Sequence, residues 1–240
     1  MAQQVFKRVE KKYLLEKAQY LKLMGQMITY VDPDQYGKHT IRNIYFDTED
    51  YDLIRASIEK PQYKEKIRLR SYGRPAEDET VFLELKKKCG GVVYKRRVKM
   101  AFGEARKYLY YGIYPQKDSQ ILREIDYAVK RYQVKPAVYL AYDRIAFTGK
   151  EDPELRVTFD LNVRARCGQL ELDKEGYDHP QLKKDQLIME VKIPGAIPVW
   201  MSRLFSELAI FPASYSKYGA FYKQYIAPQR YRYEGGRTCA

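Results

Sequence analysis

The stretch Lys66-Ile67-Arg68-Leu69-Arg70 alternates strictly between cationic and apolar side chains. Successive side chains of a β-strand point to opposite faces, so the three cations share one face and the two aliphatic residues share the other. The pattern therefore predicts a strand with one face in a core and one cationic face. For a single strand, such a face is typical of an ordinary sheet surface in contact with water.

The same alternation recurs along most of the chain. Charged or polar residues lie two or four positions apart in these pairs: Glu84 and Lys86, Lys95 and Arg97, Tyr142 and Arg144, Arg156 and Asp160, Glu190 and Lys192. Ordinary water-facing strands mix Lys with Glu, Thr, Ser and Gln, whereas these faces are rich in Arg and Lys. Arg presents a planar fork that suits phosphate oxygens, and Lys supplies a point charge. The repetition favours a sheet whose polar face holds a polyanion.

The overall composition agrees with a folded, basic protein. The 240 residues are 45% hydrophobic and include 24 tyrosines, which suffices for one large domain or two small ones. The formal net charge is +13, from 44 Lys and Arg against 31 Asp and Glu, and the basic residues are spread through the chain. This balance favours a phosphate-rich partner such as a nucleotide, polyphosphate, nucleic acid or an anionic membrane.

Several classes of protein are disfavoured. The cysteines and histidines have no zinc-binding spacing; they are Cys89, Cys167, Cys239, His39 and His179. The sequence contains no P-loop, dinucleotide fingerprint or nucleophile elbow. It also has no signal-peptide core and no uncharged apolar run of about 18 residues, so we expect a reduced, soluble, cytoplasmic protein without a membrane segment.

Hydrophobic periodicity and turn residues predict the order of elements. Strands are expected at 6–14, 40–48, 66–70, 81–86, 94–100, 138–148, 154–166 and 187–193, with a hairpin turn at Gly90-Gly91. Helices are expected at 16–31, 49–58, within 103–132, at 199–210 and at 216–227. Ser119 and Asp118 supply a start signal for the second helix of the 103–132 segment.

This order predicts an α+β fold rather than alternating βαβ units. Eight antiparallel strands with one apolar and one charged face can close into a β-barrel. Helices packed on the outside would cover the apolar faces, so the charged faces would line an inner tunnel. We expect a single domain over residues 1–226, with a helical insertion at about 103–132, and a basic, disordered tail at 227–240.

Four carboxylates lie close to cations on the expected strands: Glu10, Glu84, Asp160 and Glu190. They are consistent with cross-strand salt bridges, worth under about 1 kcal/mol each when exposed. They are equally consistent with hard oxygen ligands for Mg²⁺ or Mn²⁺, which often binds through one or two carboxylates plus substrate phosphates. Glu190 is the best candidate ligand.

The motifs and their order resemble a known family. They are Glu10-Lys11-Lys12-Tyr13, IYFD at 44–47, KIRLR at 66–70, ELK at 84–86, YKRR at 94–97, YDR at 142–144, RVTFD at 156–160, EVK at 190–192 and SKY at 216–218. Together they resemble the VTC domain, the catalytic polyphosphate polymerase module of the vacuolar transporter chaperone complex. That family lies within the triphosphate tunnel metalloenzyme (CYTH-like) superfamily. The resemblance spans roughly residues 5–226 and rests on motif order rather than on any single motif.

The resemblance implies transfer of the γ-phosphate of ATP to a growing polyphosphate chain in a basic tunnel, with Mn²⁺ or Mg²⁺. The residues that it implies for catalysis are Lys12, Arg68, Arg70, Lys86 and Arg144. The implied substrate-binding residues are Lys66, Tyr142, Lys95, Arg97, Arg156, Lys192, Ser216 and Lys217. The implied metal ligands are Glu190, Glu10, Glu84 and Asp160. The implied partners are ATP and inorganic polyphosphate, and nucleic acid is not expected.

One departure separates this chain from much of the superfamily. The common opening Glu-x-Glu-x-Lys is here Arg8, Glu10 and Lys12, which lacks the first carboxylate and fits the VTC branch better. The SPX regulatory domain and membrane helices of the eukaryotic subunits are not recognised, so we expect a stand-alone version of the domain. Two alternatives stay open: a triphosphatase or nucleotidyl cyclase on the same fold, and a non-catalytic module that binds polyphosphate or nucleic acid.

Overall fold

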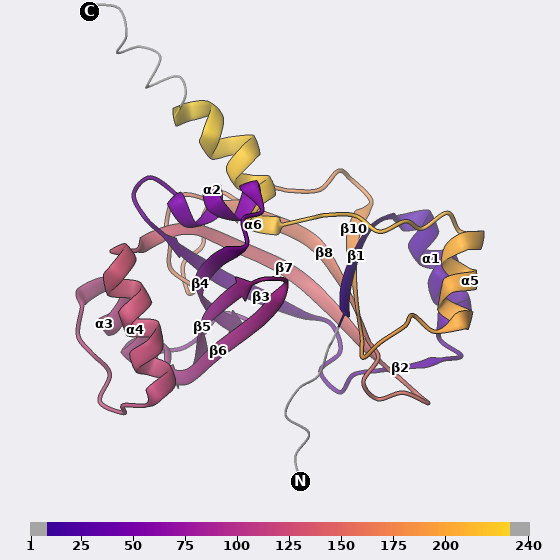
Figure 1. Ribbon diagram of the computed structural model, residues 1–240, viewed down its shortest axis with the longest axis horizontal. Coiled ribbons are helices and arrows are strands. Elements are labelled where there is room, and N and C mark those ends of the chain that lie inside the picture. The colour runs from indigo at the N-terminus through magenta and orange to yellow at the C-terminus, as the bar shows by residue number, and fades with distance from the viewer. Residues whose placement is uncertain (1–8, 231–240) are drawn as a thin grey trace, which may run out of the picture. The chain divides into compact units, whose positions relative to one another are not determined.

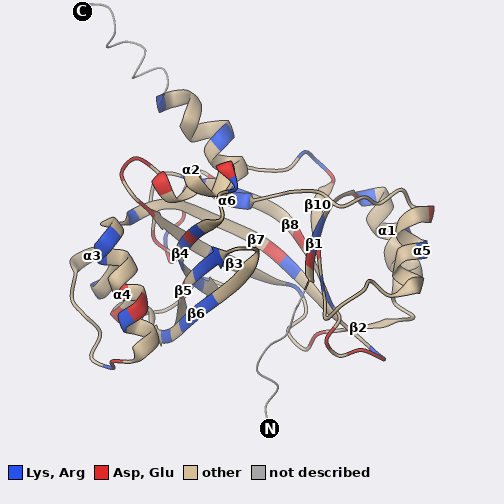
Figure 2. Cartoon of the chain, in the orientation of Figure 1, with Lys and Arg blue, Asp and Glu red and all other residues tan. Residues whose placement is uncertain are grey.

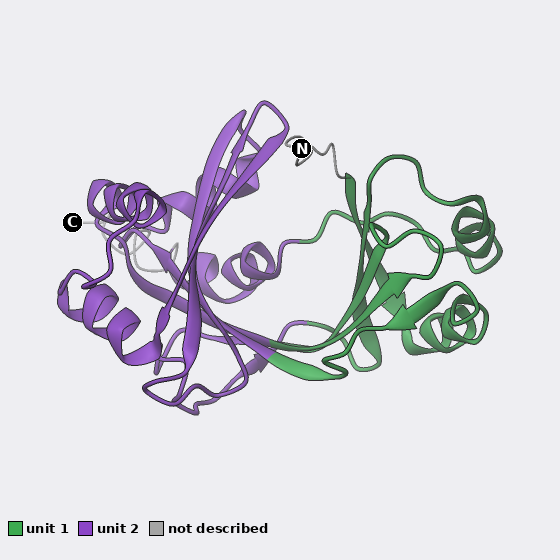
Figure 3. Cartoon of the chain, turned by 90° about the horizontal axis from the view of Figure 1, so that it is seen from below, with its two compact units in different colours: residues 1–40, 142–163, 182–215 green, residues 41–141, 164–181, 216–240 purple. Residues whose placement is uncertain are grey.

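The computed structural model describes residues 9–230 (Figure 1). The chain divides into two compact units (Figure 3). The described part of unit 1 comprises residues 9–40, 142–163 and 182–215, and that of unit 2 comprises residues 41–141, 164–181 and 216–230. Each unit is built around one antiparallel set of strands with helices on its apolar face.

Unit 1 contains the strands at the beginning and the end of the chain. Its elements are β1 (Val9–Glu16), α1 (Lys17–Met27), β2 (Val31–Pro33), the second half of β7 (Lys135–Gly149), most of β8 (Arg156–Arg166), β10 (Gln186–Ile193) and α5 (Val199–Glu207). The strands follow the order β1-β10-β8-β7, and β2 pairs with β7. The apolar face of β1, β10 and β8 presents Tyr13, Met189 and Phe159 to α1 and α5, with Leu23 and Phe205 in the same buried cluster.

Unit 2 contains the stretch that opened the sequence analysis. Its elements are most of β3 (His39–Asp47), α2 (Asp52–Glu59), β4 (Tyr63–Tyr72), β5 (Thr80–Cys89), β6 (Val92–Ala101), α3 (Phe102–Tyr111), α4 (Gln120–Tyr132), the first half of β7, the end of β8, β9 (His179–Pro180), α6 (Lys217–Phe221) and the π-helical turn η1 (Tyr222–Ile226). The strand order is β7-β3-β4-β5-β6, and β9 pairs with β8.

The alternation in β4 separates core from polar face as predicted. Ile67 and Leu69 are fully buried, and they lie opposite Leu85 and Leu83 of β5 in the antiparallel register. These four side chains belong to one core cluster with Phe102 of α3 and other residues of α3 and α4. Arg68 and Arg70 lie on the other face of the same strand. Burial of the aliphatic residues therefore fixes which way the cations point.

Most of the predicted elements are present. Gly90 and Gly91, with φ angles of 54° and 86°, form the tight turn between β5 and β6. The insertion at 103–132 is two helices, and the Ser119 hydroxyl accepts a hydrogen bond from the Leu122 N–H at the start of α4. The short strands β2 and β9 were not predicted.

Two boundaries differ from the predictions. The first helix was expected to reach Val31, but it ends at Met27, because Val31 is buried and pairs with Gly149 as the start of β2. The tail was expected to begin at 227, but residues 227–230 continue the final helix. The remainder of the expected tail, from 231, and Arg8 of the family comparison lie outside the described residues.

The predicted antiparallel sheet with helices is present, whereas its closure stays a prediction. The path of paired strands runs from β1 to β6, and within residues 9–230 these two strands are not paired with each other. The expectation of one domain over 1–226 also stays a prediction, since β7 and β8 contribute to both compact units. None of the helices in the described part of the chain is long and apolar enough to cross a membrane.

The core beneath β4 can be tested with a matched pair of leucine substitutions. Leu69→Ala removes a fully buried side chain and should lower the free energy of unfolding by about 3 kcal/mol, because the surrounding core relaxes only partly. Leu21→Ala, at a side chain that is 59% exposed on α1, should change it by less than about 0.5 kcal/mol. Urea unfolding followed by circular dichroism measures both, and equal losses would contradict this account of the core.

Candidate functional site

Lys and Arg residues recur along β4, β5 and β6 in unit 2 (Figure 2), and the strand register places Arg68 and Arg97 on the same face as Glu84. The register places Arg68, Glu84 and Arg97 directly opposite one another across the three strands. We call these three residues the glutamate row. The next row toward the Gly90-Gly91 turn consists of Lys66, Lys86 and Lys95, which we call the lysine row.

Glu84 is the centre of the glutamate row. Its side chain is 2% exposed and forms ion pairs with four cations: Arg68 at 2.7 Å, Arg70 at 2.5 Å, Lys95 at 2.9 Å and Arg97 at 2.7 Å. We call these five residues the Glu84 cluster. Four cations surround one carboxylate, so the five side chains together carry a positive excess that suits an anionic ligand.

The cations determine the protonation state of Glu84. Burial by itself acts to raise the pKa of this carboxyl group, but Arg68, Arg70 and Lys95 outweigh it and hold the pKa well below its usual range. In turn, burial lowers the pKa of Lys95 to about 8, although the neighbouring Glu84 favours its charged form. Lys95 is therefore the cation of this cluster whose charge changes near physiological pH.

The lysine row brings three like charges together across adjacent strands. Like charges directly opposite each other in a sheet are destabilising. Lys66 also donates a hydrogen bond to the Ser216 hydroxyl at 3.3 Å, which places Ser216 beside this row. The structure thus brings together nine of the residues implied for the site: Lys66, Arg68, Arg70, Glu84, Lys86, Lys95, Arg97, Ser216 and Lys217.

Aromatic residues that the sequence analysis missed support the arginines. The guanidinium groups of Arg70 and Arg97 lie 5.9 Å and 5.0 Å from the ring centroid of Phe82, and Arg68 donates to the Tyr45 hydroxyl at 3.3 Å. Phe82 and Tyr45 occupy the register positions opposite Arg70 and Arg68. Only the strand pairing reveals these contacts, because the pattern of a single strand does not show which residues lie opposite Phe82 and Tyr45.

Asp47 ties the Ser216–Lys217 segment to the sheet. Its buried carboxylate accepts hydrogen bonds from the Tyr218 hydroxyl at 2.9 Å and from the backbone N–H groups of Thr48, Leu53 and Ile54. Burial raises its pKa, against the effect of these hydrogen bonds. Asp47 is the last residue of the IYFD motif, but only the tertiary structure shows its contact with α6.

Unit 1 carries a second charged group on the polar face of β1, β7, β8 and β10. Arg144 donates to both oxygens of Asp160, at 2.6 Å and 2.7 Å, and contacts Glu190 at 3.4 Å. Lys12 contacts Glu190 at 3.2 Å and Glu10 at 3.7 Å. We call these five residues the Glu190 cluster. Its three carboxylates and two cations make it more acidic than the Glu84 cluster.

The remaining implied residues of unit 1 surround this cluster. The Arg144 guanidinium lies 5.1 Å from the centroid of the Tyr142 ring, and Lys192 lies 4.0 Å from Glu10. Burial acts to lower the pKa of Arg144, but Tyr142, Asp160 and Glu190 together raise it. Arg156 is the register partner of Lys192, and its guanidinium forms an ion pair with Asp34 at 4.0 Å.

The carboxylates of the two clusters differ in their capacity to bind a metal. Within residues 9–230 no three His, Cys, Asp or Glu side chains are grouped as a complete metal site. Both Glu84 oxygens are already bonded to cations, which opposes a role as metal ligand. Glu190 and Glu10 share Lys12, and the buried Thr158 hydroxyl, opposite Glu190 in the register, has no hydrogen-bond partner among residues 9–230. These hard oxygens fit one divalent cation that takes its other ligands from phosphates.

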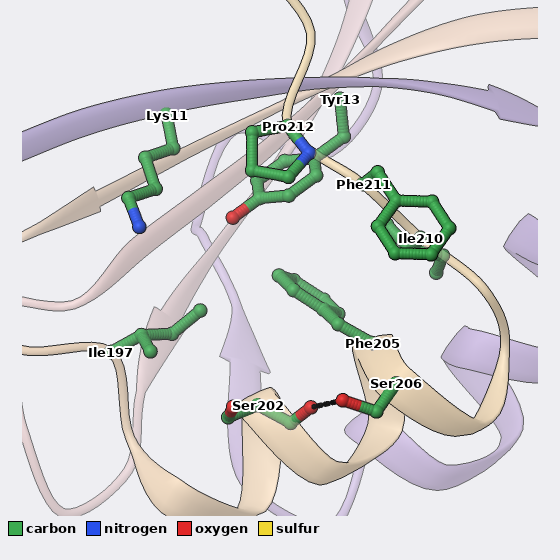
Figure 4. A pocket seen from close by; sticks show the side chains of 9 residues that line it. All are labelled: Lys11, Tyr13, Ile197, Ser202, Phe205, Ser206, Ile210, Phe211 and Pro212. Atoms are coloured by element: carbon green, nitrogen blue, oxygen red, sulfur yellow. Dashed lines mark hydrogen bonds between the residues drawn. The ribbon is translucent and has the colours of Figure 1, made fainter.

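A hollow in unit 1 lies apart from the Glu190 cluster. It has a volume of about 190 Å³ and is lined mainly by apolar side chains, including Tyr13, Phe205 and Phe211 (Figure 4). Lys11 also lines it, and Lys11 and Tyr13 point away from the face of β1 that carries Lys12. The hollow is therefore not part of the candidate site.

Residues 7–226 match the VTC domain family. The chain belongs to this family. A curated relative, vacuolar transporter chaperone complex subunit 4 of Schizosaccharomyces pombe, is 26% identical over 210 residues, which cover 70% of this chain and 29% of that protein. The VTC domain described here thus spans less than a third of that relative's length.

Solved structures share the fold of this VTC domain. A candidate adenylate cyclase from Bacillus halodurans has a TM-score of 0.56 and 14% identity, with 92% of this chain and 97% of that chain covered. A candidate adenylyl cyclase from Hippeastrum with a dominant triphosphatase activity has a TM-score of 0.51 and 16% identity, with 92% and 98% covered. At these identities the likenesses concern the fold alone.

The Glu84 cluster yields a prediction on stability. Glu84→Gln leaves four cations around a neutral amide and should lower the free energy of unfolding at pH 7 by about 3 kcal/mol. Glu59→Gln, at an exposed position in α2, should be neutral within about 0.5 kcal/mol. Urea unfolding measures both variants against the wild type.

The difference between wild type and Glu84→Gln should also depend on pH. The pKa of Glu84 is lowered in the folded chain, so its ionised form stabilises the fold above the unfolded pKa of about 4.3. This contribution is lost as pH falls below that value, toward the lowered folded pKa. The gap between the two proteins should therefore shrink between pH 7 and about pH 3. A gap that widens in acid would refute the assignment.

Proposed function

We propose that this VTC domain is an ATP-dependent polyphosphate polymerase that transfers the γ-phosphate of ATP to a growing inorganic polyphosphate chain. The observation that carries the proposal is the Glu84 cluster, in which four cations converge on one buried carboxylate. The adjoining lysine row adds three like charges on neighbouring strands, and a bound anion would reduce their mutual repulsion. Membership in the VTC domain family supports the same substrate class.

The chemistry requires positioning and charge stabilisation more than proton transfer. In the transition state, negative charge is spread over the oxygens of the transferred phosphoryl group. Cations that are already fixed in position stabilise this charge without reorganisation of the site. Glu84 pairs with both Arg68 and Arg70, and Phe82 lies against Arg70, so these forks are oriented before the substrate arrives. The attacking group would be a terminal phosphate oxygen, which is anionic near neutral pH. No general base is needed, in agreement with the lack of a histidine in either cluster.

The Glu190 cluster is proposed to hold Mn²⁺ or Mg²⁺. Glu190 with Glu10 would bind the cation, and Lys12 and Arg144 orient these carboxylates through the contacts described above. When bound, the metal would supply charge neutralisation on the substrate phosphates. Asp160 is proposed to orient Arg144 rather than to bind metal, because both of its oxygens accept from that guanidinium. Tyr142, Arg156 and Lys192 remain proposed substrate contacts, as does Lys217, and the tunnel remains part of the proposal.

A triphosphatase is the second candidate, and the fold likeness to the Hippeastrum protein is the observation that favours it. Both activities would use the same cations, since each transfers the terminal phosphoryl group of a triphosphate. They differ in the acceptor, which is water in the hydrolase. Lys12 and Glu10 on β1 are compatible with both reactions. The identity of the product therefore decides between them.

A product assay tests the proposal directly. Purified protein with ATP and Mn²⁺ should form long-chain polyphosphate and ADP, resolved by gel electrophoresis and chromatography. Arg68→Gln should lower the rate by about a hundredfold, because it removes a cation proposed to stabilise the transferred phosphoryl group. Glu190→Gln should lower the rate by about a hundredfold, because it removes a proposed metal ligand. Lys107→Gln, at an exposed position on α3, is the matched control and should keep the wild-type rate.

The identity of the product separates the candidate functions. Orthophosphate without polymer would replace the proposal by a triphosphatase, and cyclic nucleotide would replace it by a cyclase. Binding of ATP or polyphosphate without turnover in the presence of Mn²⁺ or Mg²⁺ would leave only a binding module.

The lowered pKa of Lys95 predicts how activity depends on pH. Lys95 is charged below its pKa of about 8 and neutral above it, so kcat/KM for ATP should fall as pH rises through about 8. Lys95→Arg keeps its charge throughout this range and should flatten the decline. The control is Lys107→Arg, which should retain the wild-type profile. An unchanged decline in Lys95→Arg would show that another group is responsible.

A further inference from the structure

The cationic face of β4 and β5 continues beyond the lysine row. Lys64 and Lys88 are direct partners in the antiparallel register, and each lies two residues beyond a member of the lysine row on the same face. We call Lys64 and Lys88 the outer row. The next position on β6 in this row is Val93. None of the motifs that resemble the VTC domain includes either lysine.

The outer row is crowded with positive charge. Burial lowers the pKa of Lys64, and the charges of Lys88, Lys60 and Lys86 lower it further. The Lys64 amine is held by a hydrogen bond to the Ser57 carbonyl at 3.1 Å. Among the residues that the structure describes, no carboxylate forms an ion pair with Lys64, Lys86 or Lys88. Two like charges placed opposite each other in this way cost stability unless an anion is bound.

We propose that the outer row is a second phosphate subsite, which binds the distal phosphates of a polyphosphate chain whose reacting end lies at the Glu84 cluster. Each step of two residues along a strand advances roughly 6.7 Å, so the outer row lies roughly 13 Å from the glutamate row. This distance is longer than a triphosphate group. ATP whose triphosphate is held at the glutamate row therefore does not reach the outer row through its phosphates, whereas a longer chain does. This inference rests on the proposed function.

The residues around the outer row favour a bare phosphate chain over nucleic acid. Proteins that bind single-stranded nucleic acid combine cations with aromatic side chains on which bases stack. Here the nearest tyrosines of these strands, Tyr63 and Tyr94, are register partners of Cys89 and Lys87 and so lie on the opposite face. Within the described residues of β4, β5 and β6, the outer row with its neighbour Val93 includes no aromatic side chain.

The test compares ligands of two lengths on the full chain. Calorimetry would measure the binding of inorganic tripolyphosphate and of long-chain polyphosphate to wild type, to Lys64→Gln/Lys88→Gln and to the control Lys107→Gln/Lys117→Gln. The controls carry the same charge change at exposed positions outside the three strands. The outer-row variant should lose about tenfold in affinity for the long chain and less than about twofold for tripolyphosphate, since it removes two charge-assisted contacts beyond the reach of the shorter ligand.

The outcomes distinguish this inference from the proposed function. Equal long-chain affinity of the outer-row variant and the control would overturn the subsite, and so would an equal loss for both ligand lengths. An oligouridylate with as many phosphates as the long chain serves as a third ligand, and a loss of affinity confined to it would also overturn the subsite, in favour of RNA. Wild-type protein that binds neither polyphosphate would instead remove the proposed function. A circular dichroism spectrum and unfolding midpoint like those of wild type would show that the outer-row variant is folded.

Discussion

The buried carboxylate of Glu84 holds the polar face of β4, β5 and β6 together. It lies at the middle strand of three, and the cations that reach it come from both neighbouring strands. Without it, the arginines and lysines of this face would repel one another at short range. With it, they are fixed in orientation and yet exceed the negative charge that they surround. The same contact thus stabilises the sheet and prepares it for an anionic ligand.

The balance of charge differs between the two clusters. The Glu84 cluster has one carboxylate for four cations, whereas the Glu190 cluster has three carboxylates for two cations. A phosphate chain gains most from the first arrangement, and a divalent cation from the second. In both clusters, carboxylates orient Arg and Lys side chains. In the lysine row, Lys95 shares the contact with Glu84, whereas in the outer row no described carboxylate pairs with Lys64 or Lys88, and a bound anion would compensate their charge.

Much of the sheet could be predicted from the sequence, because successive side chains of a strand alternate between its two faces. In β4, Ile67 and Leu69 must face the core, which forces Arg68 to the other side. The same logic placed Lys12, Arg144 and Glu190 on polar faces. The predicted ends of helices and strands were less accurate where pairing with a distant strand competed with the local pattern. Val31 fits the helical periodicity of the preceding residues, but it pairs with Gly149 of β7.

The sequence by itself determined the antiparallel strands, the cationic faces and the family, because alternation and motif order are local properties of the chain. Only the tertiary structure decided that Glu84 is enclosed by four cations, that Phe82 and Tyr45 support the arginines, and that Asp47 anchors the segment after Ser216. The reason is physical: a strand's own pattern says which face a side chain occupies. The register with its neighbours, which depends on the turns and the packed core, says what that side chain touches.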